Sequence, residues 1–251
     1  MRPRGNGDAC PILNFASITR PDDARLAAFA ALLMRTFSDP NSVLGLDRMQ
    51  QFLAEDPAAT GRNFNVLVAE DSGQLIGGSV FSYVPASNCG FSEYLVLDRA
   101  ARGHGLGRKL FDQRSALLDR YANPHGHVRC RGLFIEVDSP ERTPPEMLAA
   151  EQESSIDAVE RLRIFGHLGF KRVDVAYVQP PLDADKQSVD YLDLLFVPSA
   201  WSLPMGVIPV EWILKTLEPI WTAWTPALAP QYLSEFHKRI GSARLVSLLP
   251  V

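Results

Sequence analysis

The stretch Arg102-Gly103-His104-Gly105-Leu106-Gly107-Arg108 stands at the centre of the segment from Phe91 to Tyr121. A run of strand-forming residues ends shortly before it, and a helical pattern follows it. Three glycines therefore lie between a strand and a helix. Glycines let the backbone approach a ligand closely, and amide N–H groups at the start of a helix can point at one anion. The stretch predicts a phosphate-binding loop.

The spacing of the glycines excludes two common kinds of phosphate loop. A P-loop requires Gly-Lys-Ser/Thr, whereas Gly107 is followed by Arg108-Lys109-Leu110, which offers no hydroxyl for magnesium. A dinucleotide fingerprint requires Gly-x-Gly-x-x-Gly, but Gly103, Gly105 and Gly107 alternate with single residues. The pattern that remains is Arg-x-x-Gly-x-Gly after a strand.

This pattern, preceded by Leu95-Val96-Leu97-Asp98, resembles the signature of the GCN5-related N-acetyltransferase (GNAT) superfamily. A second stretch, Arg163-Ile164-Phe165-Gly166-His167-Leu168-Gly169-Phe170, is similar to the late helix of that family and its Leu-Gly-Phe exit. The two motifs occur in the family's order. The resemblance implies an α/β (α+β) GNAT fold, in which a mixed, mostly antiparallel sheet of about seven strands is flanked by helices.

The resemblance also implies acetyl-CoA as co-substrate. In the family the glycine signature binds the pyrophosphate of acetyl-CoA, and two neighbouring strands diverge to admit its pantetheine arm. Carried onto this sequence, the cofactor-binding residues are Leu95, Val96, Leu97, Arg102, Gly103, His104, Gly105, Leu106, Gly107 and Arg108. For His104 the simpler expectation is that it serves as a spacer whose backbone N–H faces the phosphate.

Composition is that of an ordinary soluble globular protein, with 251 residues, 46% hydrophobic and 22% charged. No apolar run is long enough to span a membrane, and no apolar signal segment follows Met1, so the expectation is a cytoplasmic protein without membrane partners. Three cysteines, Cys10, Cys89 and Cys130, are too widely spaced for a disulfide framework or a zinc site. We expect free thiols and no metal.

The net charge of −4 argues against a general affinity for nucleic acid. Its distribution is uneven. Residues 99–131 contain eight Lys or Arg and two Asp, whereas residues 134–193 contain thirteen acids and six bases. A basic block beside the glycine loop suits a phosphorylated cofactor, and an acidic block suits an amine-bearing acceptor, although either block could consist of solvated surface charges.

Periodicity predicts a sequence of strands and helices that fits this fold. The expected strands are 14–19, 64–70, 75–84, 91–97, 133–137, 171–179 and 189–197. The expected helices are one opened by Pro21, then 46–54, one that follows the glycine loop, and 156–168.

Three segments organise the chain. Residues 1–11 are expected to be a flexible N-terminal tail, 12–198 the acetyltransferase domain, and 199–251 a Trp- and Pro-rich helical extension. All four tryptophans lie in this extension, where two short helices are expected at 209–217 and 230–240. It could pack on the core, form a homodimer interface or cover the acceptor site. The sequence leaves these alternatives open.

Acetyl transfer to an amine requires a group that removes a proton from the ammonium. Glu93 is our candidate for this base, because many members of the family carry a glutamate at the matching position; it could instead only bind the ammonium. The family's tyrosine acid is replaced by Phe165, so Tyr177 or water could protonate the leaving thiolate, or the thiolate could leave unassisted. The further acids Glu136, Asp138, Asp190 and Asp193 could contact a cationic acceptor or face solvent.

The predicted function is an acetyl-CoA-dependent N-acetyltransferase that acts on a primary amine of a small molecule or amino sugar by direct attack in a ternary complex. A protein or peptide acceptor is the alternative within the same chemistry. Phe165 motivates a second alternative, a catalytically silent CoA-binding module.

Overall fold

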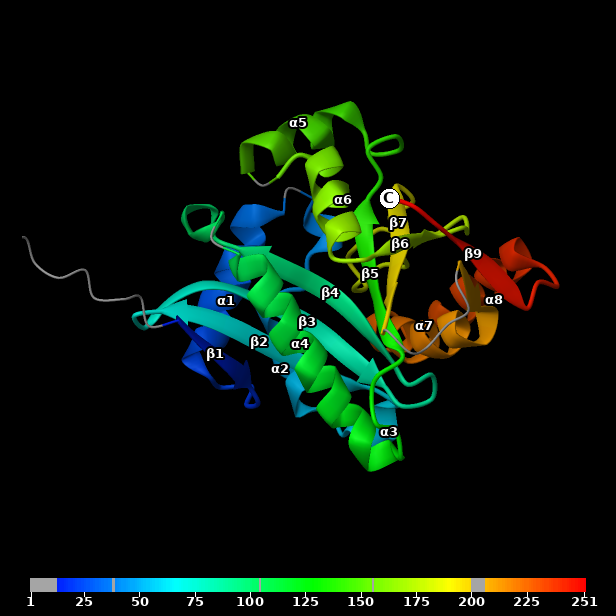
Figure 1. Ribbon diagram of the computed structural model, residues 1–251, viewed down its shortest axis with the longest axis horizontal. Helices are drawn as coiled ribbons and strands as arrows, with labels where there is room; N and C mark the ends of the chain where they lie inside the picture. The colour runs from blue at the N-terminus through cyan, green and yellow to red at the C-terminus, as the bar shows by residue number, and fades with distance from the viewer. Residues whose placement is uncertain (1–12, 38, 104, 155, 200–205) are drawn as a thin grey trace, which may run out of the picture.

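The computed structural model describes residues 13–37, 39–103, 105–154, 156–199 and 206–251. Its core is a twisted sheet with helices on both faces (Figure 1). The strands are β1 (Leu13–Ile18), β2 (Asn63–Asp71), β3 (Gln74–Val84), β4 (Cys89–Leu97), β5 (Gly132–Asp138), β6 (Lys171–Val173), β7 (Leu192–Pro198), β8 (Val207–Pro209) and β9 (Leu245–Leu249). They lie in the order β1-β2-β3-β4-β5-β7-β6-β9-β8.

The first four strands form an antiparallel meander, in which each strand pairs with the next. Between β4 and β5 the pairing is parallel, because the chain crosses over through a helix on one face of the sheet. The pairs from β5 onward are antiparallel again. The predicted mixed, mostly antiparallel sheet is therefore confirmed.

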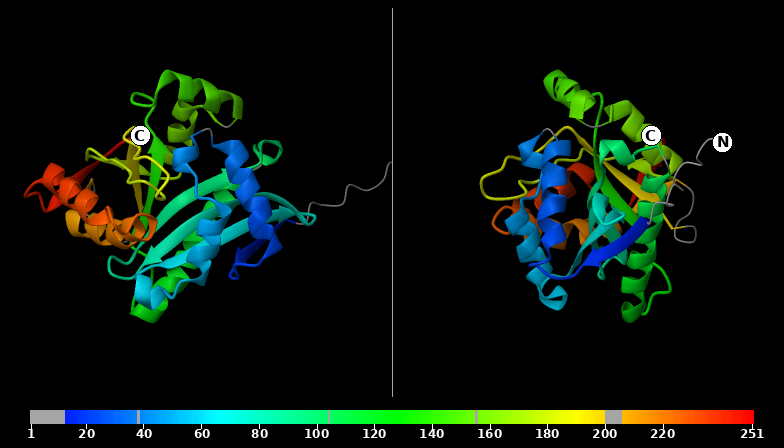
Figure 2. Two further views of the ribbon diagram at one scale, coloured as in Figure 1. Left: turned by 180° about the vertical axis from the view of Figure 1, so that it is seen from behind. Right: turned by 90° about the vertical axis from the view of Figure 1, so that its left-hand side faces the viewer.

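Helices cover both faces of the sheet (Figure 2). Their bounds are α1 (Ala24–Thr36), α2 (Leu46–Ala54), α3 (Pro57–Thr60), α4 (Leu106–Ala122), α5 (Pro145–Ser154), α6 (Ala158–His167), α7 (Val210–Trp224) and α8 (Ala229–Ile240), with 3₁₀ turns at Pro40–Ser42, Arg99–Ala101 and Asn123–His125. One apolar core lies between the sheet and α1, α2 and α7, and the other lies between the sheet and α4. No helix in the described ranges is long and apolar enough to cross a membrane.

Local sequence explains most of these elements. In α1 the side chains of Leu26, Phe29 and Leu33 form one buried stripe, and Asp23 caps the helix by accepting a hydrogen bond from the Arg25 amide. The helix predicted at 46–54 coincides with α2.

The expected strand pair 171–179 and 189–197 is only partly formed. Regular pairing involves the short β6, and further along a single bridge joins Gln179 to Val189. Two prolines follow Gln179, and proline cannot donate a hydrogen bond to a neighbouring strand. The region between β6 and β7 is therefore mostly irregular.

The number of strands differs from the expected seven, because the described part of the chain forms nine. The two additional strands, β8 and β9, come from the C-terminal segment, and β9 pairs with β6. That segment also contains α7, which continues to Trp224 rather than ending near residue 217. Because this segment contributes two strands to the sheet, it is not the purely helical extension that we expected.

Candidate active site

Strands β4 and β5 part in the middle of the sheet. Their pairing joins Gly90–Ser92 to Leu133–Ile135 and ends there. Beyond this point β4 stays paired with β3 as far as Leu97, and β5 stays paired with β7 as far as Asp138. Each strand thus keeps its outer partner while its inner edge turns toward the gap, which confirms the predicted divergence.

A β-bulge lies where the strands begin to part. Val80 of β3 pairs with Tyr94, and the next residue of β3, Phe81, pairs with Ser92, so Glu93 is the extra residue of β4. A bulge re-aims side chains that would otherwise alternate. Ser92 contacts α4 on one face, whereas Tyr94 reaches the connection between α1 and α2 on the other by hydrogen bonds to backbone atoms of residues 42 and 44.

A buried arginine supports this bulge from the α4 side. Nη1 of Arg114 donates to Ser92 Oγ at 2.6 Å and to Ser79 Oγ at 3.2 Å. Ser79 Oγ in turn donates to the carbonyl of Tyr94 at 2.7 Å. Burial lowers the pKa of Arg114 to about 9. The backbone around Glu93 is therefore held by a network of buried hydrogen bonds.

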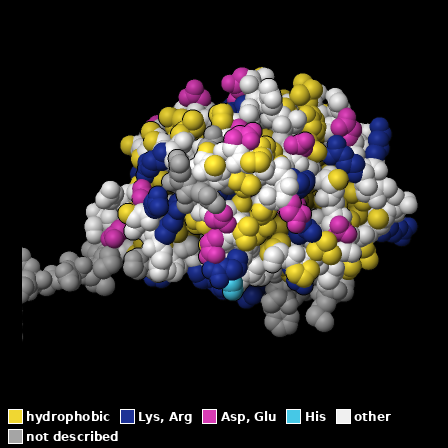
Figure 3. Space-filling view, turned by 90° about the horizontal axis from the view of Figure 1, so that it is seen from above, with side chains coloured by type: hydrophobic (Ala, Val, Ile, Leu, Met, Phe, Trp, Pro, Cys, Tyr) yellow, Lys and Arg dark blue, Asp and Glu magenta, His cyan; other side chains and the backbone are white. Residues whose placement is uncertain are grey.

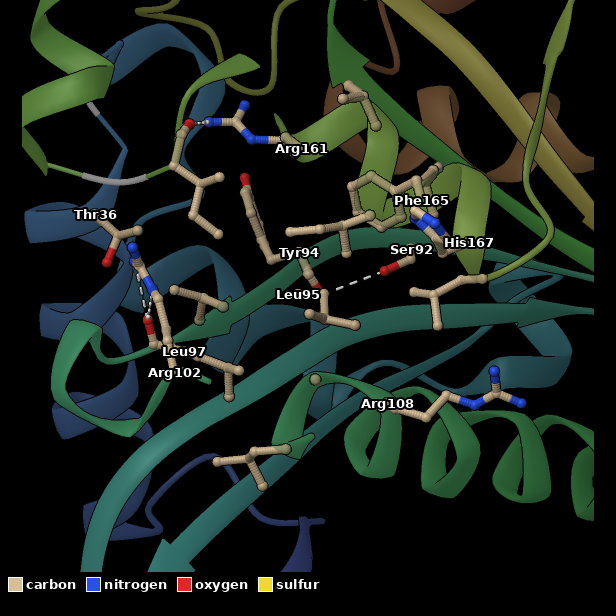
Figure 4. A pocket seen from close by; sticks show the side chains of 18 of the residues that line it. Thr36, Ser92, Tyr94, Leu95, Leu97, Arg102, Arg108, Arg161, Phe165 and His167 are labelled. Carbon is tan, nitrogen blue, oxygen red and sulfur yellow. Dashed lines mark hydrogen bonds between the residues drawn. The ribbon is translucent and has the colours of Figure 1, made fainter. Parts of the chain in front are cut away.

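The gap between the strands is part of a cavity of about 390 Å³, a size typical of ligand sites. Strand β4 lines it from Ser92 to Leu97, β5 from Ile135 to Asp138, and α6 forms another wall with Arg161, Phe165 and His167 (Figure 4). Seen from the end that carries α5 and α6, the molecular surface shows apolar side chains among acidic and basic ones (Figure 3).

The glycine loop closes one end of this cavity. Gly103 and Gly105 have φ values of +91° and +70°, which other residues adopt only with strain, and Gly105 is the N-cap of α4. A Cβ built at either glycine would meet nothing within 4 Å. The glycines therefore serve backbone conformation rather than packing, and they leave space where the first amides of α4 can bind an anion.

Every described residue of the predicted cofactor set lines the cavity: Leu95, Val96, Leu97, Arg102, Gly103, Gly105, Leu106, Gly107 and Arg108. His104 lies outside the described residues. The Arg102 guanidinium donates to the carbonyl of Leu97 from Nε at 3.3 Å and from Nη2 at 3.2 Å. Arg108 pairs with Asp112 and extends along α4 (Figure 4). Their roles toward phosphate remain predictions.

Glu93 also lines the cavity, although its side chain is only 2% exposed. Burial raises the pKa of its carboxyl to about 7, and this shift is opposed by Arg62, whose Nη1 lies 3.8 Å from Oε1. Ser82 Oγ donates to the same oxygen at 3.2 Å. The other oxygen, Oε2, has no hydrogen-bond partner among the described residues. Near neutral pH this group can take up or release a proton.

A second carboxylate, Glu136 on β5, lines the same cavity. The hydroxyl of Tyr177 donates to its Oε1, and Gln179 Nε2 donates to its Oε2 at 2.7 Å. Burial raises the pKa of Glu136 to about 7, and the negative charge of Glu93 adds to this shift. In the sequence Glu136 lies within the apolar run Phe134-Ile135-Glu136-Val137, a pattern that could have indicated a buried acid rather than a solvated one.

The other candidate acids are placed differently. Asp138 lines the cavity and forms an ion pair with Arg161. Asp193 forms an ion pair with Arg142 at 2.8 Å, and Asp190 is exposed.

Tyr177, the candidate acid, is not among the residues that line the cavity, and its role toward the thiolate stays a prediction. Its side chain is 1% exposed, its hydroxyl is engaged with Glu136, and its ring packs against Trp221 and Phe236. Phe165 does line the cavity. His167 lines it as well, and sequence reasoning missed this residue because nothing in its pattern distinguishes it from a surface histidine.

No group of three or more His, Cys, Asp or Glu side chains in the described ranges is arranged to hold a metal ion. Cys89 and Cys130, the cysteines within those ranges, are buried free thiols.

Comparison with known proteins points to one family. The family profile described as the acetyltransferase (GNAT) family matches residues 26–143. A search of curated proteins finds no matching sequence. Among solved structures, one from Bacteroides thetaiotaomicron that is described as belonging to the GNAT family is 16% identical, covers 92% of this chain and 99% of its own, and has a TM-score of 0.52.

Two other solved structures are less similar to this chain. A tandem GNAT protein of the clavulanic acid biosynthesis pathway is 16% identical, with 91% of this chain and 64% of that chain covered and a TM-score of 0.50. A structure from Bacillus anthracis in complex with acetyl coenzyme A is 14% identical, with 60% and 68% covered and a TM-score of 0.37.

Proposed function

We propose that this chain is an acyltransferase that transfers the acetyl group of acetyl-CoA to a primary amine of a small molecule or amino sugar, by direct attack in a ternary complex. The match of residues 26–143 to the GNAT acetyltransferase profile and the fold shared with the structure from Bacteroides thetaiotaomicron support this proposal. The observation that carries this proposal is the cavity between β4 and β5. It connects a glycine loop that suits a diphosphate with a buried carboxylate that suits an ammonium.

The residues of the cavity fit the parts of acetyl-CoA. The first amides of α4, beside Gly103 and Gly105, would bind the diphosphate. The inner edges of β4 and β5 would receive hydrogen bonds from the pantetheine amides, because backbone groups on these edges have lost each other as partners. When bound, acetyl-CoA supplies an acetyl group activated as a thioester.

Glu93 is the proposed general base. An amine attacks only as the free base, so the ammonium must first lose a proton, and a carboxylate with a pKa near 7 can accept it at neutral pH. Amide N–H groups on the open edge of β4 would stabilise the negative charge on the thioester oxygen as the N–C bond forms. Breaking the C–S bond then releases a thiolate. The nitrogen of the new amide loses its remaining extra proton to water, and the thiolate takes a proton from water because Phe165 cannot provide one.

The C-terminal helices support a small acceptor. Helix α7 packs on the same face of the sheet as Glu93, where Trp224 contacts Phe91 edge to face and Trp221 contacts Tyr177. A peptide acceptor would need an open groove beside the carboxylates. These buried aromatic contacts occupy part of that face, which favours a compact amine.

The experiment that tests this function is the release of free CoA thiol from acetyl-CoA in the presence of small amines, amino sugars and peptides with free N-termini. We expect release with small amines, and a loss of about 10²- to 10⁴-fold in kcat for Glu93→Gln, the usual contribution of a general base. The exposed variant Glu211→Gln is the matched control and should keep wild-type activity.

Two results would count against the proposal. Faster turnover of peptides than of small amines would reassign the acceptor class. Tight binding of acetyl-CoA without thiol release for any amine would indicate a silent CoA-binding module.

A further inference from the structure

Two buried carboxylates face one cavity from the two strands that diverge. Glu93 lies in the bulge of β4, and Glu136 lies on β5, one residue beyond the last β4–β5 pair at Ile135. They are close enough for the charge of Glu93 to raise the pKa of Glu136. Two such groups are costly to bury unless something compensates their charge.

The protein places positive charge beside the two carboxylates unequally. Arg62 lies 3.8 Å from Glu93, but it also forms a closer ion pair, at 3.0 Å, with Glu55. Among the described residues, Glu136 accepts hydrogen bonds from Tyr177 and Gln179, and both of these side chains are neutral. A cation placed between the two carboxylates would therefore relieve their repulsion.

We propose that Glu136, held by Tyr177 and Gln179, binds the ammonium group of the acceptor beside Glu93, so that the acceptor is a primary amine that arrives as a cation. This inference rests on the proposed function and extends it to the recognition of the acceptor.

The hydrogen bonds give the two carboxylates different tasks. Both oxygens of Glu136 are held by donors, which fixes the orientation of the group while leaving lone pairs for an ammonium N–H. On Glu93 the Oε2 atom receives no hydrogen bond from the part of the chain that the structure describes. Glu136 therefore anchors the cation, and Glu93 accepts its proton.

Tyr177 and Gln179 are positioning residues in this arrangement. The ring of Tyr177 is packed against Trp221 of α7 and Phe236 of α8, so the C-terminal segment sets the position of its hydroxyl. Through this chain of contacts, residues distant in the sequence determine how the ammonium is held.

The test compares Glu136→Gln with wild type, using two kinds of nucleophile. One is the best small amine found by thiol release, which is cationic at neutral pH. The other is hydroxylamine, which is uncharged at pH 8. We expect Glu136→Gln to raise KM for the cationic amine about 10- to 100-fold, because the variant loses one charge-assisted hydrogen bond to the ammonium. The KM values for hydroxylamine and for acetyl-CoA should stay within about twofold of wild type.

Two further variants separate positioning from overall stability. Tyr177→Phe should raise KM for the cationic amine by a smaller factor and leave kcat close to wild type, whereas Glu93→Gln should lower kcat for both nucleophiles. Asp190→Asn, an exposed acid from the same acidic block, is the matched control and should change neither constant. If Glu136→Gln fails to fold, Tyr177→Phe tests the same point.

Calorimetric binding of the amines to the protein with CoA distinguishes failure of this inference from failure of the proposed function. If Glu136→Gln has the same KM as wild type for the cationic amine as well as for hydroxylamine, the ammonium site is overturned while the transferase activity stands. Binding that depends on Glu136, without any thiol release, would retain the site and overturn the activity. Neither binding nor turnover with any amine would overturn both.

Discussion

Replacement of Gly105 by glutamate tests the assignment of the phosphate loop most directly. Gly105 begins α4 with a φ of +70°, and a Cβ there would point into open space at the mouth of the cavity. Any L-residue at this position carries a backbone penalty of roughly 1–2 kcal/mol. A glutamate adds bulk and negative charge where we expect the diphosphate of CoA.

The magnitude follows from Coulomb's law. A carboxylate about 5 Å from a phosphate charge, at an effective dielectric constant of about 20, is repelled by about 3 kcal/mol per unit charge. We therefore expect Gly105→Glu to raise the Kd of CoA by about 100-fold or more. Gly105→Ala carries the same backbone penalty without the charge, so it should lose much less affinity.

Isothermal titration calorimetry with CoA and with pantetheine measures the effect. Pantetheine lacks the diphosphate, so its affinity should change little in Gly105→Glu. Gly73→Glu is a matched control, because Gly73 has a φ of +82°, is equally open, and lies in the turn between β2 and β3. Unchanged CoA affinity in Gly105→Glu, or an equal loss in Gly73→Glu, would refute the assignment of the loop.

Two further predictions concern stability. The pKa values of Glu93 and Glu136 are raised from 4.5 to about 7, so ionisation of these carboxyls is more costly in the folded state than in the unfolded state. The free energy of unfolding should therefore fall as the pH rises from about 4.5 to about 7, by at most about 3 kcal/mol per carboxyl. Urea denaturation at pH 5 and pH 8 should show this fall in wild type, and an equal fall in the double variant Glu93→Gln/Glu136→Gln would contradict it. Trp221→Ala removes a fully buried ring that packs on Tyr177 and Phe236, and should cost about 3–5 kcal/mol, whereas the partly exposed Trp212→Ala should cost less. Equal unfolding midpoints for the two tryptophan variants would contradict the larger contribution that we expect from the buried ring of Trp221.

The strand, glycine loop and helix at the centre of the chain could be predicted from local patterns, whereas the fold class was implied by the resemblance that two motifs carry. The strand that ends at Leu97, the glycine loop and the following helix are adjacent in the chain, and their backbone preferences are set by neighbouring residues. The β2–β3 hairpin follows in the same way from a polar turn between two apolar runs. The local patterns led to the glycine loop, and the resemblance to the family led to Glu93.

The acceptor side of the site could not be predicted from local patterns. Glu136 and its partner Tyr177 lie 41 residues apart, and their contact depends on how an irregular segment folds back between β6 and β7. Arg114 shows no sign in its helical pattern that it will be buried beneath the bulge of β4. In each case the partner is distant in sequence.

The sequence by itself determined several of the helices, the meander and the glycine loop, because each depends on residues within a few positions of one another. Only the tertiary structure decided that β8 and β9 extend the sheet, that α7 joins the core beside Tyr177, and that two carboxylates share one cavity. Such contacts arise when distant segments bury apolar surface together, and local propensity carries no record of which segments will meet.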